Sequence, residues 1–366
     1  MTLMEKSERN DKRYIPINKG NYTMEPPERE ELFEKSRSEG WEEEYRQYRT
    51  NWSDYPRRQF ISGYPLLVDL ELSSICNLRC PMCYTITPEF KSKVGAGLMD
   101  IGLFKKIIDE ISGKTPAIRL SLRGEPTIHP HFIEAVSYAK QRGIKEVSTL
   151  TNGSRLTREF FIQAMDAGID WITISVDGTD ATYEKIRKPL KFGDILQKIK
   201  DVKTVKEESG SNRPVIKIQA IWPAIKDNPE KFYNTFAPFT DLIAFNPLID
   251  YLGNDDDIEY EDNFSCCQLY QRVVIGSDGR AMMCSNDEDG SVIIGDANIE
   301  RIYDIWHGAG LNRIREIHKQ KEMFMGIPAC RKCYLPRRTQ EDETSVVNDR
   351  PFIIKNYVNR NQHIGM

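Results

Sequence analysis

Three features are missing from this sequence. No apolar run approaches the ~20 residues that a membrane-spanning helix needs. The stretch MTLMEKSERNDKRY carries charge but no apolar core, which excludes a secretory signal in it. No Lys/Arg tract stands out, and a net charge of -4 gives no indication of nucleic-acid binding. We therefore predict a cytoplasmic protein with neither a membrane nor a nucleic acid as its partner.

Cysteine is also missing from most of the chain. None lies between Cys83 and Cys266, and none follows Cys333. The eight that are present form two groups, namely Cys76, Cys80 and Cys83, and then Cys266, Cys267, Cys284, Cys330 and Cys333. A reducing compartment disfavours a disulfide framework. The segregation therefore predicts two metal sites in two structural units.

What is present begins with a polar extension. The chain has 366 residues, of which 39% are hydrophobic and 29% charged, as expected for one large globular domain with an appendage. Residues 1–62 are rich in Glu and Arg, and we expect one or two short helices there. Composition favours a surface extension, although its Trp and Tyr residues leave open a role in covering the domain that follows.

Residues 63–250 alternate between two periodicities. Six strands are predicted, at 65–72, 117–122, 146–151, 171–176, 215–222 and 241–246. Helical spacing separates them, at 99–111, 131–143, 157–168, 194–209 and 229–239. This alternation predicts an α/β fold with a parallel sheet, and six units are fewer than the eight of a closed barrel, so we expect a partial barrel. Its functional residues should lie at the carboxyl ends of the strands, where Cys76, Gly124, Asn152 and Ser175 are found.

The alternation stops after Asp250. An acidic linker is expected at 251–263, a hairpin around Asp278-Gly279, and a helical stretch at 301–320. We assign residues 251–335 to a small cysteine-rich domain and 336–366 to a polar C-terminal tail.

The first cysteine group has the spacing C-x3-C-x2-C. A structural zinc ion and a [4Fe-4S] cluster each call for four ligands, and three thiolates supply only three. Either a distant residue completes a zinc site, or an iron-sulfur cluster keeps one iron open for a small chelating molecule.

The sequence around this loop resembles the radical SAM superfamily. The loop follows a predicted strand and ends at Tyr84. Four further motifs are similar to those of that family: RGEPTIHP at 123–130, TNG at 151–153, ISVDG at 174–178 and IQAIW at 218–222. The family's fold, a partial (β/α)6 TIM-like barrel, agrees with the strand count.

The resemblance implies roles for the matching positions. Cys76, Cys80 and Cys83 would hold a [4Fe-4S] cluster whose open iron binds S-adenosyl-L-methionine, which is cleaved to a 5'-deoxyadenosyl radical. Glu125 would accept from the methionyl ammonium, Gly124 would allow close backbone approach, and the Tyr84 backbone would meet the adenine. Asn152, Ser175 and Gln219 would contact ribose or carboxylate, and Arg187 would pair with the carboxylate. Alternatively, Ser175 and Gln219 are satisfied strand residues and Arg187 is a solvated charge.

The second cysteine group follows the pattern C-x12-G-x4-C, then C-x2-C, through Cys266, Cys284, Cys330 and Cys333. Four thiolates close either one iron-sulfur cluster or one zinc site. After a radical SAM barrel the pattern resembles the SPASM/twitch extension, as do DGRAMMC and IYDIWHGAGLNRIR. A full SPASM domain carries more cysteines, so the shorter twitch form with one auxiliary [4Fe-4S] cluster is expected.

Cys267 is surplus in this scheme. It is a buried thiol, or a catalytic hydrogen-atom donor, or it is the ligand and Cys266 is the spare.

For the reaction, we favour oxidation of a carbinol on a carbohydrate or aminocyclitol-like small molecule. The auxiliary cluster would accept the electron, and a flavodoxin or ferredoxin would be the reductant. Two alternatives are a peptide- or protein-modifying maturase, of the ribosomal-peptide or sulfatase type, and a redox-neutral epimerase or dehydratase that uses Cys267. A zinc-binding interaction protein without catalysis would instead be colourless.

Overall fold

A six-stranded parallel sheet forms the centre of the molecule. The computed structural model describes residues 13–248, 257–360 and 364. The strands stand side by side in chain order: β2 (Leu67–Leu70), β3 (Ala117–Arg119), β4 (Glu146–Thr151), β5 (Trp171–Ser175), β6 (Val215–Ile221) and β7 (Leu242–Asn246). The predicted α/β partial barrel is therefore confirmed, and each predicted strand is present.

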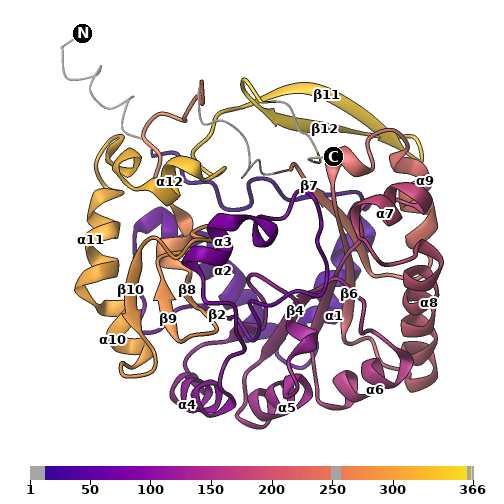
Figure 1. Cartoon of the computed structure of the whole chain (residues 1–366), viewed down its shortest axis with the longest axis horizontal. Helices are drawn as coiled ribbons and strands as arrows, with labels where there is room; N and C mark the ends of the chain where they lie inside the picture. Colours follow the sequence, from indigo (N-terminus) through magenta and orange to yellow (C-terminus); the bar gives the residue numbers. More distant parts are fainter. Residues whose placement is uncertain (1–12, 249–256, 361–363, 365–366) are drawn as a thin grey trace.

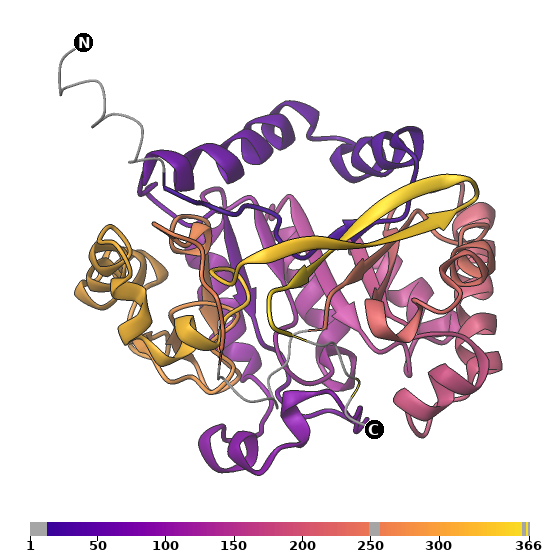
Figure 2. The same ribbon diagram turned by 90° about the horizontal axis from the view of Figure 1, so that it is seen from above.

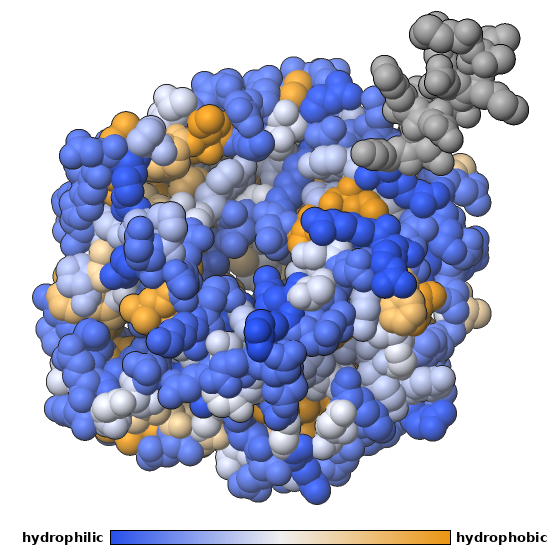
Figure 3. All heavy atoms as spheres, turned by 180° about the vertical axis from the view of Figure 1, so that it is seen from behind, coloured by the Kyte–Doolittle hydropathy of each residue, from blue (hydrophilic) through white to orange (hydrophobic). Residues whose placement is uncertain are grey.

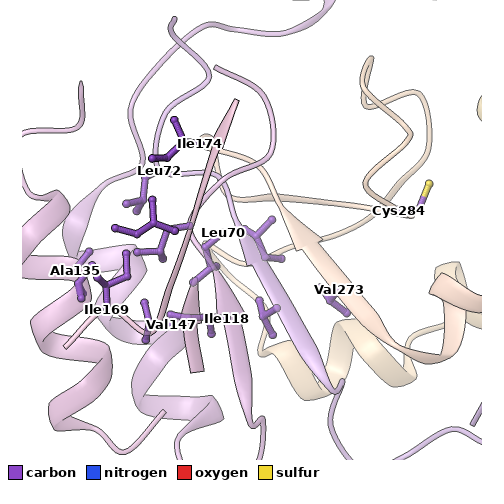
Figure 4. Close-up of a cluster of buried hydrophobic side chains, with 14 of the residues drawn as sticks. Leu70, Leu72, Ile118, Ala135, Val147, Ile169, Ile174, Val273 and Cys284 are labelled. Carbon is purple, nitrogen blue, oxygen red and sulfur yellow. The ribbon is translucent and has the colours of Figure 1, made fainter. Parts of the chain in front are cut away.

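Helices cover the outer face of this sheet (Figure 1). They are α4 (Ile101–Ile111), α5 (Phe132–Gln141), α6 (Arg158–Asp166), α8 (Phe192–Ser209) and α9 (Pro229–Phe236), with the shorter α7 (Asp180–Ile186) between α6 and α8. Another short helix, α3 (Pro88–Lys93), lies before α4 in the chain, on the segment that follows the first cysteines. Alternate strand residues such as Leu70, Ile118 and Val147 are fully buried and belong to the main apolar core (Figure 4). Because strand side chains alternate, the residues between them point to the inside of the barrel.

A small C-terminal unit extends the sheet beyond β2. Strand β8 (Arg272–Ile275) pairs in parallel with β2, and β9 (Arg280–Met282) and β10 (Ile293–Asp296) follow in antiparallel fashion. The hairpin predicted around Asp278-Gly279 is present. The stretch predicted as helical is divided into α10 (Ile302–His307) and α11 (Ala309–Ile317), and α12 (Pro328–Lys332) comes before the last cysteine. Much of the expected acidic linker lies outside the described residues.

The N-terminal extension closes the other edge and the floor of the barrel. Strand β1 (Tyr22–Thr23) pairs antiparallel with β7, and α1 (Pro27–Ser38) and α2 (Glu42–Arg58) run beneath the sheet (Figure 2). The aromatic side chains of these helices form a buried cluster with Leu66, Leu67 and Ala117; they are Trp41, Tyr45, Tyr48 and Trp52. The interpretation of residues 1–62 as a surface extension is therefore wrong for this part, because its aromatic stripe is needed to cover the barrel floor.

The C-terminal segment is a hairpin rather than a plain tail. Strands β11 (Thr339–Val347) and β12 (Arg350–Tyr357) pair antiparallel and cross the molecule beside α9 (Figures 1 and 2). Trp222 fixes the hairpin, because its Nε1 donates to Glu343 Oε1 at 2.8 Å. Short 3-10 turns complete the fold, at Tyr84–Ile86, Pro126–Ile128, Trp222–Ala224, Cys267–Tyr270 and Met323–Gly326.

The outer surface is largely hydrophilic, and apolar residues form only small separate patches on the face seen in Figure 3. Within the described ranges, none of the helices has the length and apolar character to cross a bilayer.

Candidate functional site

The first cysteine loop leaves the carboxyl end of β2. All eight cysteines of the chain are free thiols, with Cys80 buried and Cys76 and Cys83 half-buried. Burial raises the pKa of Cys76 and raises that of Cys80 to about 11, and the neighbouring thiols of the loop add to both rises. The three sulfurs are therefore close enough to influence one another, although only one is fully enclosed.

Gly124 brings the loop after β3 against the cysteine loop. Its φ is +62°, and a Cβ there would lie 2.4 Å from the Ser73 carbonyl oxygen and 2.6 Å from that of Ile75. The next amide, Glu125 N, donates to Ile75 O at 2.8 Å. Only glycine combines this left-handed conformation with so close an approach, so the position expected to allow backbone contact does so within the protein itself.

The Glu125 carboxylate is buried and hydrogen-bonded through both oxygens. Its Oε1 accepts from Thr127 N at 3.1 Å, Thr127 Oγ1 at 2.5 Å and Thr151 Oγ1 at 2.6 Å, and its Oε2 accepts from Asn152 N at 2.7 Å. A carboxylate has about four acceptor positions, two on each oxygen, so Oε2 keeps one position for a further donor such as a methionyl ammonium. In this structure Glu125 fastens the end of β4 to the loop after β3.

Asn152 and Tyr84 are also engaged with the loop. Asn152 Nδ2 donates to Asn77 Oδ1 at 2.8 Å and lies 3.9 Å from Cys76 Sγ. The Tyr84 carbonyl accepts from Thr87 N at 3.0 Å and from Thr87 Oγ1 at 2.8 Å. Asn152 therefore supports the position of the first cysteine, and contacts of either residue with a nucleoside stay predictions.

Ser175 and Gln219 face each other across β5 and β6, at the carboxyl ends of the strands. Ser175 is buried, and the Gln219 side-chain amide lies 3.0 Å from that of Asn246 on β7. This is where polar groups were expected on the inside of the barrel. The structure thus brings Ser175 and Gln219 together on the inner side of the barrel, at the carboxyl ends of the strands.

Arg187 is not a solvated charge. Its guanidinium forms an ion pair with Asp177, with Nε 2.7 Å from Oδ2, and the side chain is only 14% exposed. Asp177 raises the pKa of Arg187 against the effect of burial, and the Arg187 charge in turn opposes the pKa rise of Cys80. The alternative of a surface charge is therefore wrong, and a methionyl carboxylate would have to share Arg187 with Asp177.

The second cysteine group is more enclosed than the first. Burial raises the pKa of Cys284 and Cys330 well above the usual range and that of Cys333 to about 12. The charge of Cys266 adds to the rise at each of these three thiols. Cys267 is not among the main influences on those three. Its thiol instead bonds to Cys266 and lies near Arg272 and Tyr334. The arrangement favours Cys266 over Cys267 as the fourth ligand.

Two nitrogen donors and a histidine ring contact these sulfurs. Asn286 Nδ2 lies 3.2 Å from Cys333 Sγ, and Leu335 N lies 3.4 Å from the same atom. His318 Nε2 lies 3.4 Å from Cys330 Sγ, and burial lowers the pKa of this imidazole to about 4. Donors of this kind stabilise thiolates and set the potential of a bound iron-sulfur centre.

The donor sets fit iron-sulfur clusters. In the described part of the chain, no three or more His, Cys, Asp or Glu side chains converge as a single ion requires. A zinc ion draws its sulfurs to ~2.3 Å from one point, whereas a four-iron cluster binds each thiolate through a different iron. Three thiols in one group and four in the other match an open and a closed cluster.

The barrel interior has a charged lining that was not predicted from the sequence. Asp69 on β2 forms ion pairs with both Arg119, at 2.8 Å, and Arg272, at 3.1 Å. Lys217 on β6 is buried, and its Nζ lies 3.2 Å from Asn21 Oδ1. The signal was the single charged residue of the strand VIKIQAI.

A cavity of about 300 Å³ opens beside this interior. It lies between the segment that leads into β1 and the C-terminal hairpin, and Asn21, Lys19, Tyr22 and Lys355 help to line it. Arg123 and Trp222 do not line this cavity. Arg123 forms a bidentate pair with Glu71, with Nε and a terminal nitrogen each at 2.6 Å from the carboxylate, and Trp222 contacts the hairpin.

Two family models match the chain. Residues 70–218 match the radical SAM superfamily, and residues 266–334 match SPASM, an iron-sulfur cluster-binding domain. The matches fall on the barrel and on the cysteine-rich unit.

Several curated proteins are similar to part of the chain. A tungsten-containing aldehyde ferredoxin oxidoreductase cofactor-modifying protein from Pyrococcus furiosus is 33% identical over 160 residues, 42% of each chain. An AdoMet-dependent heme synthase from Methanosarcina barkeri is 32% identical over 128 residues, 35% of this chain and 36% of that protein. The alignments thus span less than half of these relatives.

Solved structures share the fold over more of the chain. BtrN in complex with AdoMet and 2-DOIA aligns with a TM-score of 0.54 at 16% identity, over 81% of this chain and all of that one. SuiB from Streptococcus suis, bound to S-adenosylmethionine, aligns with a TM-score of 0.53 at 13% identity, over 80% of this chain and 78% of that one. At such identities the similarity concerns the fold alone.

Proposed function

Because this chain belongs to the radical SAM superfamily and carries a C-terminal SPASM domain, we propose that it oxidises a carbinol of a sugar-like small molecule. The two domains imply a [4Fe-4S] cluster that binds S-adenosylmethionine and an auxiliary cluster. When bound, these groups supply a carbon-centred radical that takes a hydrogen atom, and an acceptor for the electron left behind.

The residues of the barrel hold the first cluster and orient S-adenosylmethionine. Cys76, Cys80 and Cys83 are the proposed ligands of the first cluster. Gly124 and Glu125 fix the loop against them, and Asn152 supports Cys76 through its side-chain amide. We assign Ser175, Gln219 and Arg187 to S-adenosylmethionine, with Tyr84 beside its adenine. The helices α1 and α2 exclude water from the barrel floor, as radical chemistry requires.

The observation that carries oxidation is the closed second site. Cys266, Cys284, Cys330 and Cys333 influence one another in an enclosed setting, and β8 joins this unit directly to β2 of the barrel. A cluster with four protein ligands offers no open iron to a substrate and is suited to accept an electron. A redox-neutral epimerase is the second candidate, because the Cys267 thiol lies near Arg272 of the barrel interior.

The test follows the fate of one electron. Anaerobically reconstituted protein is reduced, by dithionite or by a flavodoxin or ferredoxin, and given S-adenosylmethionine and sugars deuterated at their carbinol carbons. We expect deuterium in 5'-deoxyadenosine, one ketone per 5'-deoxyadenosine, and a reduced auxiliary cluster by electron paramagnetic resonance. Solvent hydrogen in an epimerised product, abolished by Cys267→Ala, would instead establish the redox-neutral reaction. Modification of a peptide, with no sugar oxidised, would contradict the substrate class.

A further inference from the structure

Lys217 is a charged residue on the inner face of the barrel. It belongs to β6, where Ile216, Ile218 and Ala220 are buried on the helix side. Strand alternation therefore directs Lys217 to the same side as Gln219, two residues further on. Its neighbour in the register is Thr173 of β5, one step below the pair of Ser175 and Gln219. Lys217 thus lies directly beneath the residues assigned to S-adenosylmethionine.

The Lys217 ammonium has no counter-charge among the described residues. Lys217 is only 7% exposed, and no described carboxylate lies within 4 Å of its Nζ. Its hydrogen-bond partner is the Asn21 side-chain oxygen, at 3.2 Å. The guanidinium of Arg37, another cation, repels the Lys217 ammonium. Burial and this repulsion both lower the pKa of Lys217, to about 8. Lysine is almost never enclosed in this way without a partner.

The rest of the interior does not balance this charge. Asp69 is shared between two guanidiniums, those of Arg119 and Arg272. Glu146, on the barrel floor, forms a bidentate ion pair with Arg37, whose Nε lies 2.5 Å and a second nitrogen 2.9 Å from the carboxylate. Both of these carboxylates are thus paired with arginine, and neither neutralises Lys217.

A cavity that is open to solvent lies next to this point. Asn21, which accepts from Lys217, also lines the cavity of about 300 Å³ together with Lys19 and Lys355. Those two lysines are paired, Lys19 with Glu261 at 3.9 Å and Lys355 with Glu341 at 2.7 Å, whereas Lys217 is not. One residue therefore connects the open cavity with the buried ammonium.

We infer that Lys217 binds an anionic oxygen group of the substrate, a carboxylate or a phosphate, and so orients the carbinol inside the barrel. The inference rests on the proposed function and narrows its substrate class. Sugar acids and sugar phosphates supply the missing counter-charge, whereas an amine-bearing aminocyclitol would add a further cation to an interior that already has a surplus.

The first test asks whether the buried charge of Lys217 destabilises the folded protein. Lys206 is a matched control, since it is buried to a similar extent (8% exposed) but forms an ion pair with Asp241 at 2.7 Å. In the reconstituted holoprotein, Lys217→Met should raise Tm by about 2–4 °C, because it removes an uncompensated charge. Lys206→Met should lower Tm, because it leaves Asp241 unpaired. A fall in Tm for Lys217→Met as large as that for Lys206→Met would show a structural role and overturn the inference.

The second test asks for the anion. Inorganic phosphate and succinate are added to the holoprotein at constant ionic strength, with chloride as reference, and Tm and the S-adenosylmethionine affinity are measured. We expect at least one anion to raise Tm in the wild type and in Lys206→Met but not in Lys217→Met. The affinity of each protein for S-adenosylmethionine should stay within about twofold of the wild-type value, since a lost ionic contact would weaken it by about tenfold. The more effective anion identifies phosphate or carboxylate.

Three results would overturn the inference: no anion effect in the wild type, an equal effect in Lys217→Met, or loss of S-adenosylmethionine affinity in Lys217→Met. The last would assign Lys217 to the methionyl carboxylate. Failure of the proposed function is separately visible, because the wild type would then form no ketone from the deuterated sugars, whatever the anion results.

Discussion

The two cysteine groups use the same donor atom in opposite surroundings. The first has three thiols on a loop, two of them half-buried, beside the polar and charged interior of the barrel. The second has four thiols, three of them buried, within a small unit that adds its strands to the edge of the sheet. In Figure 4, Cys284 lies on this added unit, at one end of the buried cluster that also contains Leu70. The difference teaches that ligand number and enclosure, rather than ligand type, separate a site open to a substrate from one closed to it.

The largest expected effect comes from breaking the closed site. Cys284→Ala should lower the iron content from about eight to about four per chain, because it removes a ligand that interacts with Cys266 and Cys333. Cleavage of S-adenosylmethionine should persist, while carbinol oxidation should be lost. Cys267→Ala is the matched control and should keep all the iron. Equal iron loss in both variants would show that the assignment of the fourth ligand is wrong.

The next effect concerns how the open site is held. Gly124→Ala places a methyl group 2.4 Å from the Ser73 carbonyl oxygen. Gly143 has a φ of +84° with open space around it, so Gly143→Ala reports the conformational strain alone. We expect Gly124→Ala to lower the free energy of unfolding by about 3 kcal/mol more than its control, and to suppress S-adenosylmethionine cleavage. Urea unfolding and 5'-deoxyadenosine formation measure the two effects, and equal behaviour of the variants would contradict the close packing seen here.

The charge beside the open site gives a pH dependence. Burial holds the pKa of Lys217 at about 8 in the folded chain, against 10.5 in the unfolded chain. Below pH 8 the lysine is charged in both states, so the full cost of burial is present. As the pH rises from 8 towards 10.5 the folded state loses its proton first, and stability should rise by up to about 3 kcal/mol. The difference in unfolding free energy between wild type and Lys217→Met should shrink over this range, and a difference independent of pH would contradict the burial.

The smallest effect tunes the closed site without opening it. Asn286→Ala removes a donor 3.2 Å from Cys333 Sγ and should lower the reduction potential of the auxiliary cluster, by the equivalent of about 1 kcal/mol. Asn298→Ala is the control, since Asn298 bonds to Asp278 and Asp296 in the same unit and not to a sulfur. Potentiometry followed by electron paramagnetic resonance gives both values. An equal shift in the two variants would show that Asn286 acts through the fold and not on the sulfur.

The sequence predicted the barrel because its signals are local. Each strand is a short apolar run, and each helix has apolar residues at helical spacing, so chain neighbours are enough to identify them. The first cysteine loop is equally local, since its three thiols lie within eight residues.

The pairings between distant segments could not be predicted in the same way. The partners of Glu125 include Thr151, and those of Arg123 include Glu71, and nothing near either residue indicates them. The C-terminal hairpin was missed because charges such as those of Glu341 and Glu343 hide its alternation. The helical spacing of Trp41, Tyr45, Tyr48 and Trp52 was visible, however, and indicates a buried face that composition alone concealed.

The central claim is that one chain holds an open cluster in the barrel and a closed cluster beside it. Iron and sulfide analysis with a visible spectrum, on wild type and on Cys76→Ala/Cys80→Ala/Cys83→Ala prepared without oxygen, tests it most directly. We predict about eight iron atoms in the wild type, and in the variant about four, still coloured, with no S-adenosylmethionine cleavage. A colourless variant, or one that still cleaves S-adenosylmethionine, would contradict it.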